Sequence, residues 1–205
     1  MLTAFTAGLL LITVSELGDK TFFIAAILAM RHSRRLVFAG AIAALAAMTV
    51  LSVTIGQAAT LFPKHYVFYA EIVLFVGFGL KLLYDASKMS AKAECDEVEE
   101  ALEAVEEAEL KMTNKENPLT ILLKTFTMTF VAEWGDRTQF ATISLAAAYH
   151  PVGVTAGAIL GHSICAAIAV LSGRMIAKRI SERTMTALGG VLFLIFAVVS
   201  WVEGV

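Results

Sequence analysis

The sequence has little of what the metal, disulfide and nucleotide sites of soluble proteins are made from. Its 205 residues include two cysteines, Cys95 and Cys165, three prolines, and a charged fraction of only 17%. The cysteines form no CxxC pair, so neither a disulfide framework nor a cysteine-based metal site is indicated. Phosphate-loop, nucleophile-elbow, HExxH and dinucleotide-binding motifs are also absent, which argues against an ATP-driven pump and against an enzyme. We expect no bound cofactor and no nucleic-acid partner.

The sequence instead contains long runs of apolar residues. Hydrophobic residues make up 58% of the chain, a composition typical of integral membrane proteins, so the lipid bilayer is an expected partner. A bilayer core of about 30 Å takes roughly 20 helical residues, and apolar runs of that length predict transmembrane helices. Six runs predict an all-α membrane protein with six transmembrane helices: Leu2–Met30, Leu36–Leu61, Tyr66–Ser87, Leu119–Tyr149, Val152–Ala177 and Met185–Glu203.

The basic residues predict how these helices are oriented, because short cytoplasmic connections are enriched in lysine and arginine. The second connection holds a single lysine, Lys64, and the fourth holds none. We therefore expect a multi-pass protein of the inner (plasma) membrane with both termini outside. The basic residues after the first and fifth runs are Arg31, Arg34, Arg35, Lys178, Arg179 and Arg183.

Residues 88–118, here called the acidic segment, separate the third run from the fourth and are expected in the cytoplasm. They contain ten acidic residues and four lysines. Apolar residues at spacings of three and four predict a surface amphipathic helix. It is either a linker that joins two halves or an acidic surface that concentrates cations at the cytoplasmic mouth. The apolar residues are Val98, Ala101, Leu102, Val105, Ala108 and Met112.

The sequence repeats itself after 117 residues. That offset aligns Glu16–Phe23 with Glu133–Phe140, and Ala39–Ile42 with Ala156–Ile159. The chain therefore divides into a three-helix repeat (1–87), the acidic segment (88–118) and a second three-helix repeat (119–205). Because three is an odd number, the second repeat enters the membrane from the opposite side, and the two are expected to be inverted repeats around a pseudo-two-fold axis in the membrane plane.

Each repeat carries one copy of an acidic hexapeptide, Glu16–Thr21 in the first and Glu133–Thr138 in the second. An ionisable side chain in mid-membrane costs about 2.5–3.5 kcal/mol, so these residues are expected to face the protein interior. Two carboxylates three residues apart share a helix face, and the two-fold axis brings both pairs together. Four such carboxylates need protons or a cation to compensate their charge, which predicts a cation/proton exchanger. They are Glu16, Asp19, Glu133 and Asp136.

The other polar residues around the hexapeptides have expected supporting roles. All-oxygen ligands suit Mn²⁺, Ca²⁺ and Mg²⁺. The alternative is that each hexapeptide is an ion-pair network that only fixes helix packing. The supporting residues are neutral oxygen donors (Thr21, Thr138 and Gln139), charge-compensating cations that pair with a carboxylate when the metal is absent (Lys20 and Arg137), and glycines at a helix break or close contact (Gly18 and Gly135).

Three further polar residues lie inside the predicted membrane helices. His162 and Cys165 are spaced to share one helix face, which permits a soft-metal site, but packing is the favoured interpretation because the repeat equivalent of His162 is Leu45. Glu71 permits a proton path, but an interfacial position is favoured. Glycines are expected where helices pack closely; they are Gly40, Gly56, Gly157, Gly161 and Gly173.

The hexapeptides match the signature Glu-x-Gly-Asp-(Lys/Arg)-(Ser/Thr). By this signature the sequence resembles the family once catalogued as uncharacterised protein family sixteen, also grouped as the second calcium:proton antiporter family, with Golgi, chloroplast and bacterial members. The resemblance covers both membrane halves. It implies transport of Mn²⁺ and Ca²⁺, in bacteria mainly Mn²⁺ export, in exchange for protons. The implied metal and proton carriers are Glu16, Asp19, Glu133 and Asp136.

We therefore expect a secondary transporter that exports Mn²⁺, with Ca²⁺ as the alternative substrate. The second copy has Trp134 and Gln139 where the first has Leu17 and Phe22, so the two half-sites need not contribute equally. The competing hypotheses are a cation channel without proton coupling, an exchanger of Na⁺ or Mg²⁺, and a structural membrane protein or membrane enzyme. The sequence leaves the oligomeric state open.

Overall fold

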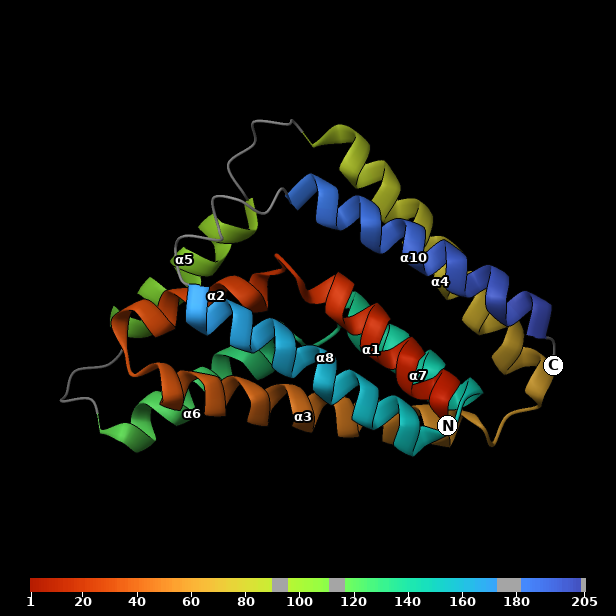
Figure 1. Ribbon diagram of the computed structural model, residues 1–205, viewed down its shortest axis with the longest axis horizontal. Coiled ribbons are helices and arrows are strands. Elements are labelled where there is room, and N and C mark those ends of the chain that lie inside the picture. Colours follow the sequence, from red (N-terminus) through yellow and green to blue (C-terminus); the bar gives the residue numbers. More distant parts are fainter. Residues whose placement is uncertain (90–95, 111–116, 173–181, 204–205) are drawn as a thin grey trace.

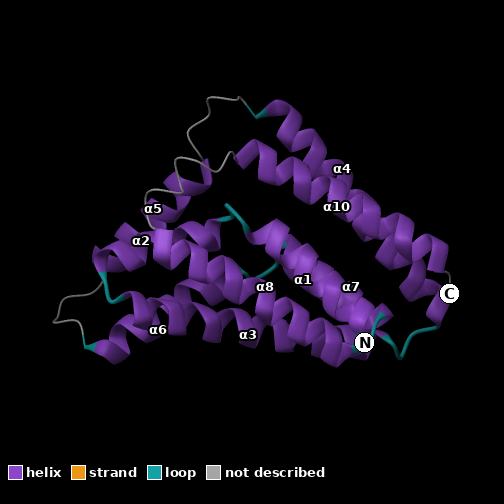
Figure 2. Cartoon of the chain, viewed as in Figure 1, coloured by secondary structure: helices purple, strands orange, loops and turns teal. Residues whose placement is uncertain are grey.

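The computed structural model describes residues 1–89, 96–110, 117–172 and 182–203, and these residues form helices joined by short turns (Figure 2). The helices follow the labels of Figure 1. They are α1 (Leu2–Glu16), α2 (Lys20–Arg31), α3 (Arg34–Ala59), α4 (Lys64–Lys88), α5 (Asp96–Leu110), α6 (Pro118–Ala132), α7 (Arg137–Ala148), α8 (Pro151–Ser172) and α10 (Glu182–Glu203).

Four of these helices are long and apolar enough to cross a membrane: α3, α4, α8 and α10. They correspond to four of the six predicted runs. Large apolar side chains point outward from them, for example Val73 and Leu171, which are 70% and 71% exposed. Since such residues are unfavourable in water, this exposure is the pattern of lipid-facing helices.

The predicted runs Leu2–Met30 and Leu119–Tyr149 do not each form a single helix. Each run is divided into two shorter helices, α1 and α2 in the first repeat and α6 and α7 in the second. The breaks occur at Gly18 and Gly135, whose φ angles are +86° and +82°. A helix of L-residues does not continue through the left-handed region, and glycine enters that region without a Cβ clash. The expected helix break at both glycines is therefore present.

The same close helix contact occurs twice, each time between a helix of one repeat and a helix of the other. In the pairing of α3 with α6, a Cβ added to Gly40 would lie 2.7 Å from the carbonyl oxygen of Leu122. In the pairing of α8 with α1, a Cβ at Gly157 would overlap the carbonyl oxygen of Phe5. Both the glycines and their partners are 117 residues apart in the sequence. The two backbones approach this closely only because the side chain is absent.

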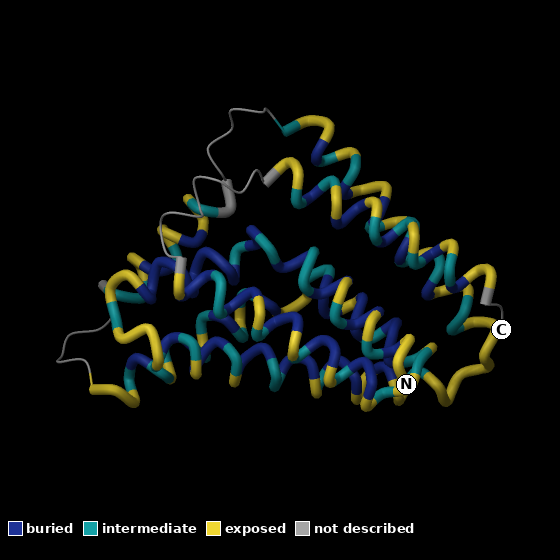
Figure 3. The backbone as a smooth tube through the Cα atoms, in the orientation of Figure 1, coloured by how far each residue is buried: buried dark blue, intermediate teal, exposed yellow. Residues whose placement is uncertain are grey.

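Helices α4 and α10 form a separate pair beside the other membrane helices (Figure 1). Phe75 and Phe193 are fully buried between them, with ring centroids 5.9 Å apart. A second ring pair, Phe78 with Phe140, connects α4 to α7. Figure 3 shows buried residues along the facing sides of the larger group, which contains α1, α2, α3, α7 and α8. The pair α4–α10 is thus attached to the body mainly through α7 and α1.

The amphipathic helix expected in the acidic segment is present as α5, although Met112 lies outside the described residues. Ala101 and Val105 are fully buried and pack against α2. Glu100 pairs with Lys20 at 3.0 Å, and Glu109 pairs with Arg31. Helix α5 is therefore docked on the body of the protein by an apolar face and by ion pairs.

Glu109 is the centre of the ion pairs that hold α5. It lies near three basic side chains, Arg31, Lys124 at 3.6 Å and His32 at 3.4 Å. Partial burial by itself raises the pKa of Glu109, but the hydrogen bond from Arg31 and the charges of Lys124, Arg31 and His32 outweigh it, and the pKa is lowered below its ordinary value. The docked position thus favours the ionised form of this carboxylate.

Candidate cation site

The two helix breaks place the acidic hexapeptides at helix ends in the protein interior. Glu16 is the last residue of α1, and Glu133 follows the last residue of α6. Asp19 and Asp136 hold the equivalent positions directly before α2 and α7. The amino-terminal ends of α2 and α7, which carry the positive ends of the helix dipoles, therefore begin at these carboxylates.

Three of the four predicted carboxylates lie together. One oxygen each of Glu16, Asp19 and Glu133 falls within 4.8 Å of the other two. The three residues are 2%, 8% and 2% exposed. We call this group the acidic cluster. It joins residues of both repeats, as the pseudo-two-fold arrangement predicts.

Asp136, the fourth predicted carboxylate, lies beside the cluster rather than in it. It is half-buried, and its side chain caps α7 by accepting hydrogen bonds from the backbone N–H of Thr138 at 3.2 Å and from its hydroxyl at 3.1 Å. The same hydroxyl is 3.4 Å from Glu133 Oε2. Thr138 therefore connects Asp136 to the acidic cluster.

The predicted neutral oxygen donors behave differently from one another. The hydroxyl of Thr21 donates to Glu16 Oε2 at 3.1 Å, the counterpart of the contact between Thr138 and Glu133. Gln139, by contrast, accepts a hydrogen bond from the backbone N–H of Gly135 at 2.7 Å through Oε1. Its oxygen therefore supports the helix break, and the threonine hydroxyls are the neutral groups at the carboxylates.

The two predicted charge-compensating residues also differ. Arg137 donates to Asp19 Oδ1 at 2.5 Å and to the backbone carbonyl of Ser15 at 3.3 Å, so the cation of the second repeat pairs with the acidic cluster. The amine of Lys20 instead reaches Glu100 on α5. Lys20 does pair with a carboxylate, but with one outside the hexapeptides, because α5 presents its acidic face where α2 begins.

Several buried polar atoms around the acidic cluster have no hydrogen-bond partner among the described residues. Each hexapeptide contributes one carboxylate oxygen, Oε1 of Glu16 and Oε1 of Glu133. Two hydroxyls join them, Ser15 on α1 and Thr129, one turn before Glu133 on α6. Buried polar atoms are rarely left without a partner because the desolvation cost is not recovered. This set of oxygens is therefore suited to holding a cation.

His162 is a further buried polar residue at the cluster, although the sequence favoured packing for it. Its Nδ1 lies 4.0 Å from Glu16 Oε2 and has no hydrogen-bond partner among the described residues. Cys165, on the same helix, donates from Sγ to the carbonyl oxygen of Thr13 at 3.4 Å. Ser15 and Thr129 were missed by the sequence argument, although the spacing of Thr129, four residues before Glu133, was a usable signal.

Comparison with known proteins agrees with this geometry. The chain matches the family described as divalent cation/proton antiporter GDT1 over residues 4–90 and 121–205, and each matched stretch contains one hexapeptide. The chain belongs to the GDT1 family. It is therefore a membrane transporter of the cation/proton antiporter class rather than an enzyme, and its substrate is a divalent cation. The resemblance drawn from the hexapeptides is confirmed.

Relatives of this GDT1-family chain occur in a cyanobacterium and in plants. It is 59% identical over 201 residues to GDT1-like protein sll0615 of Synechocystis sp., covering 98% of each chain. It is 46% identical to GDT1-like protein 4 of Oryza sativa subsp. indica, covering 97% of this chain and 73% of the relative. The chloroplastic protein PAM71-homolog of Arabidopsis thaliana is 45% identical, and the match covers 95% of this chain and 58% of the relative. No solved structure matches the chain.

Proposed function

We propose that this protein exports Mn²⁺ from the cytoplasm in exchange for protons, and that Glu16, Asp19, Glu133 and Asp136 carry both ions. The observation that supports this most directly is the burial of three carboxylates from two repeats within 4.8 Å of one another. Such a group is unstable when fully ionised and dry, so its charge has to be compensated by protons or by a cation.

The charges of the site suggest how the two ions alternate. The acidic cluster carries three negative charges when ionised, and Arg137 supplies one positive charge at Asp19. The remaining two negative charges of the cluster, with Asp136 not counted, match one divalent cation or two protons. Asp136, held through Thr138, is the carboxylate that we expect to approach when the ion binds. Because the same oxygens serve both ions, binding of the metal and binding of protons exclude each other.

His162 favours Mn²⁺ over the alternative substrate, Ca²⁺. Calcium takes oxygen ligands in large numbers, typically six to eight. First-row divalent metals such as Mn²⁺ also bind nitrogen ligands, and the imidazole of His162 lies 4.0 Å from Glu16. We expect His162→Gln to lower the preference for Mn²⁺ over Ca²⁺. Competition of the two ions for transport in the variant and in wild type measures that ratio; an unchanged ratio would exclude His162 as its cause, and a wild-type preference for Ca²⁺ would favour Ca²⁺ as the substrate.

The proposal includes the inverted-repeat architecture. Helices α2 and α7 begin 117 residues apart, as do α3 and α8, and the contact of Gly40 with Leu122 recurs as that of Gly157 with Phe5. We propose repeats at 1–87 and 119–205, six membrane-crossing segments of which the first and fourth are broken, and alternating access by rocking of one repeat against the other. Both termini lie outside the inner membrane and the acidic segment lies in the cytoplasm.

The test is simultaneous recording of Mn²⁺ and pH in proteoliposomes that contain wild type, Glu16→Gln or Asp136→Asn. Wild type should couple the two fluxes, and each variant should transport Mn²⁺ at least about tenfold more slowly. A loss of that size is the lower end of what is seen when a group that only supports the metal ligands is removed. Glu103→Gln, which removes an exposed carboxylate of α5, is the control. Unchanged transport in both site variants would exclude the site, and Mn²⁺ flux without proton flux would indicate a channel.

A further inference from the structure

Glu71 is a further buried ionisable residue within the membrane helices, remote in sequence from the hexapeptides. It lies on α4, two turns from its start, and is only 3% exposed because the protein itself covers it. The hydroxyl of Ser200 on α10 donates to its Oε1 at 2.8 Å. A charged side chain inside the membrane is costly, and its presence there is a reason to expect a function for it.

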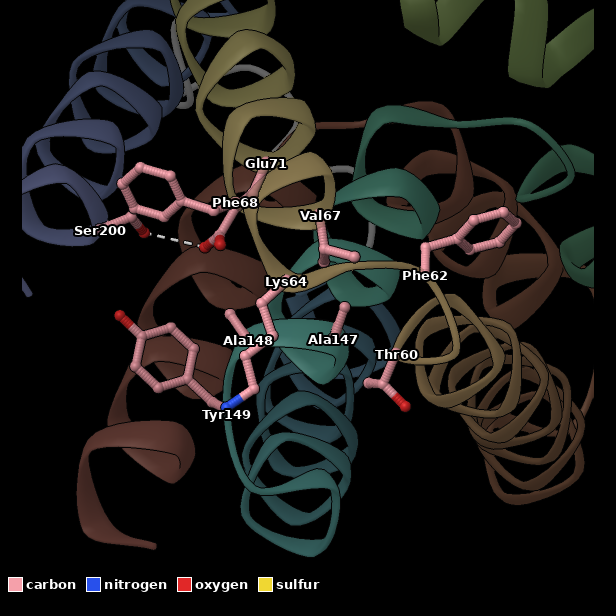
Figure 4. A pocket seen from close by; sticks show the side chains of 10 residues that line it. All are labelled: Thr60, Phe62, Lys64, Val67, Phe68, Glu71, Ala147, Ala148, Tyr149 and Ser200. Carbon is pink, nitrogen blue, oxygen red and sulfur yellow. Dashed lines mark hydrogen bonds between the residues drawn. The ribbon is translucent and has the colours of Figure 1, made fainter. Parts of the chain in front are cut away.

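The Glu71 carboxylate lines a cavity of about 270 Å³ between α4, α10 and the end of α7 (Figure 4). A second cavity of about 240 Å³ shares Glu71, Phe62 and Val67 with the first and extends along α7 to Ser144 and Ile143. Glu71 is thus buried within the protein but borders space that is large enough for several water molecules.

Helix α7 connects these cavities to the acidic cluster. Its last residues, Ala147 and Ala148, line the first cavity, whereas its first residue follows Asp136. Twelve residues of α-helix span about 18 Å. Glu71 therefore lies about one short helix away from the carboxylates that are proposed to exchange the ions.

The cavity lies toward the proposed outer side of the membrane. Thr60 and Phe62, from the α3–α4 connection, and Tyr149, from the α7–α8 connection, line it. Figure 1 places the two chain ends at one end of the molecule and α5 at the opposite end. By the orientation proposed above, these connections face the outside, and α5 faces the cytoplasm.

We infer that Glu71 is a proton-binding site of the antiport, separate from the acidic cluster and loaded from the outer side. This inference rests on the proposed function. A hydronium ion gives its proton to a Glu71 carboxylate oxygen and leaves as water, and the proton then moves along α7 toward the cluster. Glu71 is the one carboxylate among the residues that line the first cavity, and a single carboxylate beside Lys64 is a poor site for a divalent cation. Among the residues that line the cavity, Lys64 and Tyr149 are the other titratable groups.

The inference is tested by measuring proton-coupled Mn²⁺ transport against external pH in proteoliposomes. Glu71→Gln should lose its response to external pH and about a hundredfold in rate when the outer side is acidic, the lower end of the typical loss for a removed proton-transfer group. The KM for Mn²⁺ at the cytoplasmic side should not change. Glu71→Asp, which keeps the carboxylate, should restore most of the response.

Two more variants separate proton binding from a packing role. Ser200→Ala removes the donor to the carboxylate, so the midpoint of the profile should shift toward higher pH while the maximum rate is retained. Tyr69→Phe, at an exposed position of the same helix, is the control and should match wild type. A wild-type rate and profile in Glu71→Gln would overturn the inference, as would equal losses in Glu71→Gln and Glu71→Asp, or a raised KM for Mn²⁺.

The outcomes also distinguish this inference from the proposed function. Wild-type protein that couples Mn²⁺ to protons, together with an unaffected Glu71→Gln variant, would reject Glu71 alone. Wild-type protein that moves Mn²⁺ without protons would reject the antiport, and the role of Glu71 with it.

Discussion

Gly135 shows how a single residue determines the geometry of the site. Its φ of +82° forms the break before α7, yet a Cβ built there would meet no atom within 4 Å. The need for glycine is thus conformational and not steric. Gly135→Ala should destabilise the protein by about 1–2 kcal/mol, the usual cost of a left-handed residue with a Cβ, and should displace Asp136.

Thermal unfolding in detergent, together with Mn²⁺ flux, checks this prediction. Gly77→Ala is a matched control because its Cβ also meets no atom within 4 Å, but Gly77 lies in the middle of α4 with helical geometry. Alanine is favoured over glycine there by about 1 kcal/mol. Equal effects of the two substitutions would show that the turn conformation is unimportant.

The unequal partners of Lys20 and Arg137 lead to a second prediction at the residue scale. The side chains of Arg137 and Asp19 are 21% and 10% exposed, whereas those of Lys20 and Glu100 are 35% and 60% exposed. Removing one member of a buried pair costs about 3–5 kcal/mol, whereas an exposed pair contributes about 0–1 kcal/mol. Arg137→Gln should therefore abolish transport or folding, and Lys20→Gln should leave both nearly intact. Unfolding midpoints and flux for both variants provide the comparison.

The sequence predicted which carboxylates come together but not how the charged residues are paired. Ionisable residues repeated inside apolar runs identified Glu16, Asp19 and Glu133, because the membrane makes them costly. The contact of Lys20 with Glu100 was out of reach, since it depends on where a helix 80 residues further along docks. His162 was set aside because the repeat gives it no polar equivalent, although only the packing of α8 decides what it faces.

At the scale of elements, the close contact of α3 with α6 depends on Gly40. A Cβ there would lie 2.7 Å from the Leu122 carbonyl oxygen, and backbone has to move to relieve it. Gly40→Ala should cost about 1–3 kcal/mol, as other overpacked positions do. Gly189→Ala, whose Cβ would make an ordinary 3.7 Å contact with Leu82, is the control. Gly40→Ala should therefore unfold at a lower temperature than Gly189→Ala. Equal unfolding midpoints would show that the contact of Gly40 with Leu122 is not as close as described.

The docking of α5 should depend on pH through Glu109. Its pKa is lowered from an ordinary value of 4.5 in the docked state, so the ionised carboxylate stabilises docking. The contribution is fully present above about pH 4.5, where Glu109 is ionised in both the docked and the undocked helix. It is lost as the pH falls below 4.5 and through the lower pKa that Glu109 has in the docked state. Proteolysis of the acidic segment should therefore accelerate in that acidic range, and Glu109→Gln should be cut faster at neutral pH.

The helix breaks were the least predictable elements. Both runs were apolar enough to suggest one continuous crossing, and a glycine inside a helix is often tolerated at a cost of about 1 kcal/mol. The acidic residues on either side of Gly18 and Gly135 indicated a site. They did not decide whether these glycines break the helix or allow close packing. The four unbroken helices followed directly from hydropathy, with ends within a few residues of the predicted ones.

For the whole molecule, the repeat in the sequence carried more information than any single motif. The 117-residue offset predicted equivalent helix ends and equivalent contacts, including those of Gly40 and Gly157. It did not predict that α4 and α10 form a separate pair that packs on α7 and α1. Contacts of this kind depend on side chains that differ between the repeats, such as Phe78, which packs on Phe140 and whose equivalent in the second repeat is Ile195.

The docking of α5 also has a consequence for directionality. Two identical half-sites facing opposite ways would serve traffic from either compartment equally well. Because Lys20 pairs with Glu100 while Arg137 pairs with Asp19, the two halves are not interchangeable, and the segment that joins them contributes to the difference. We therefore expect the duplicated fold to transport ions at unequal rates in the two directions.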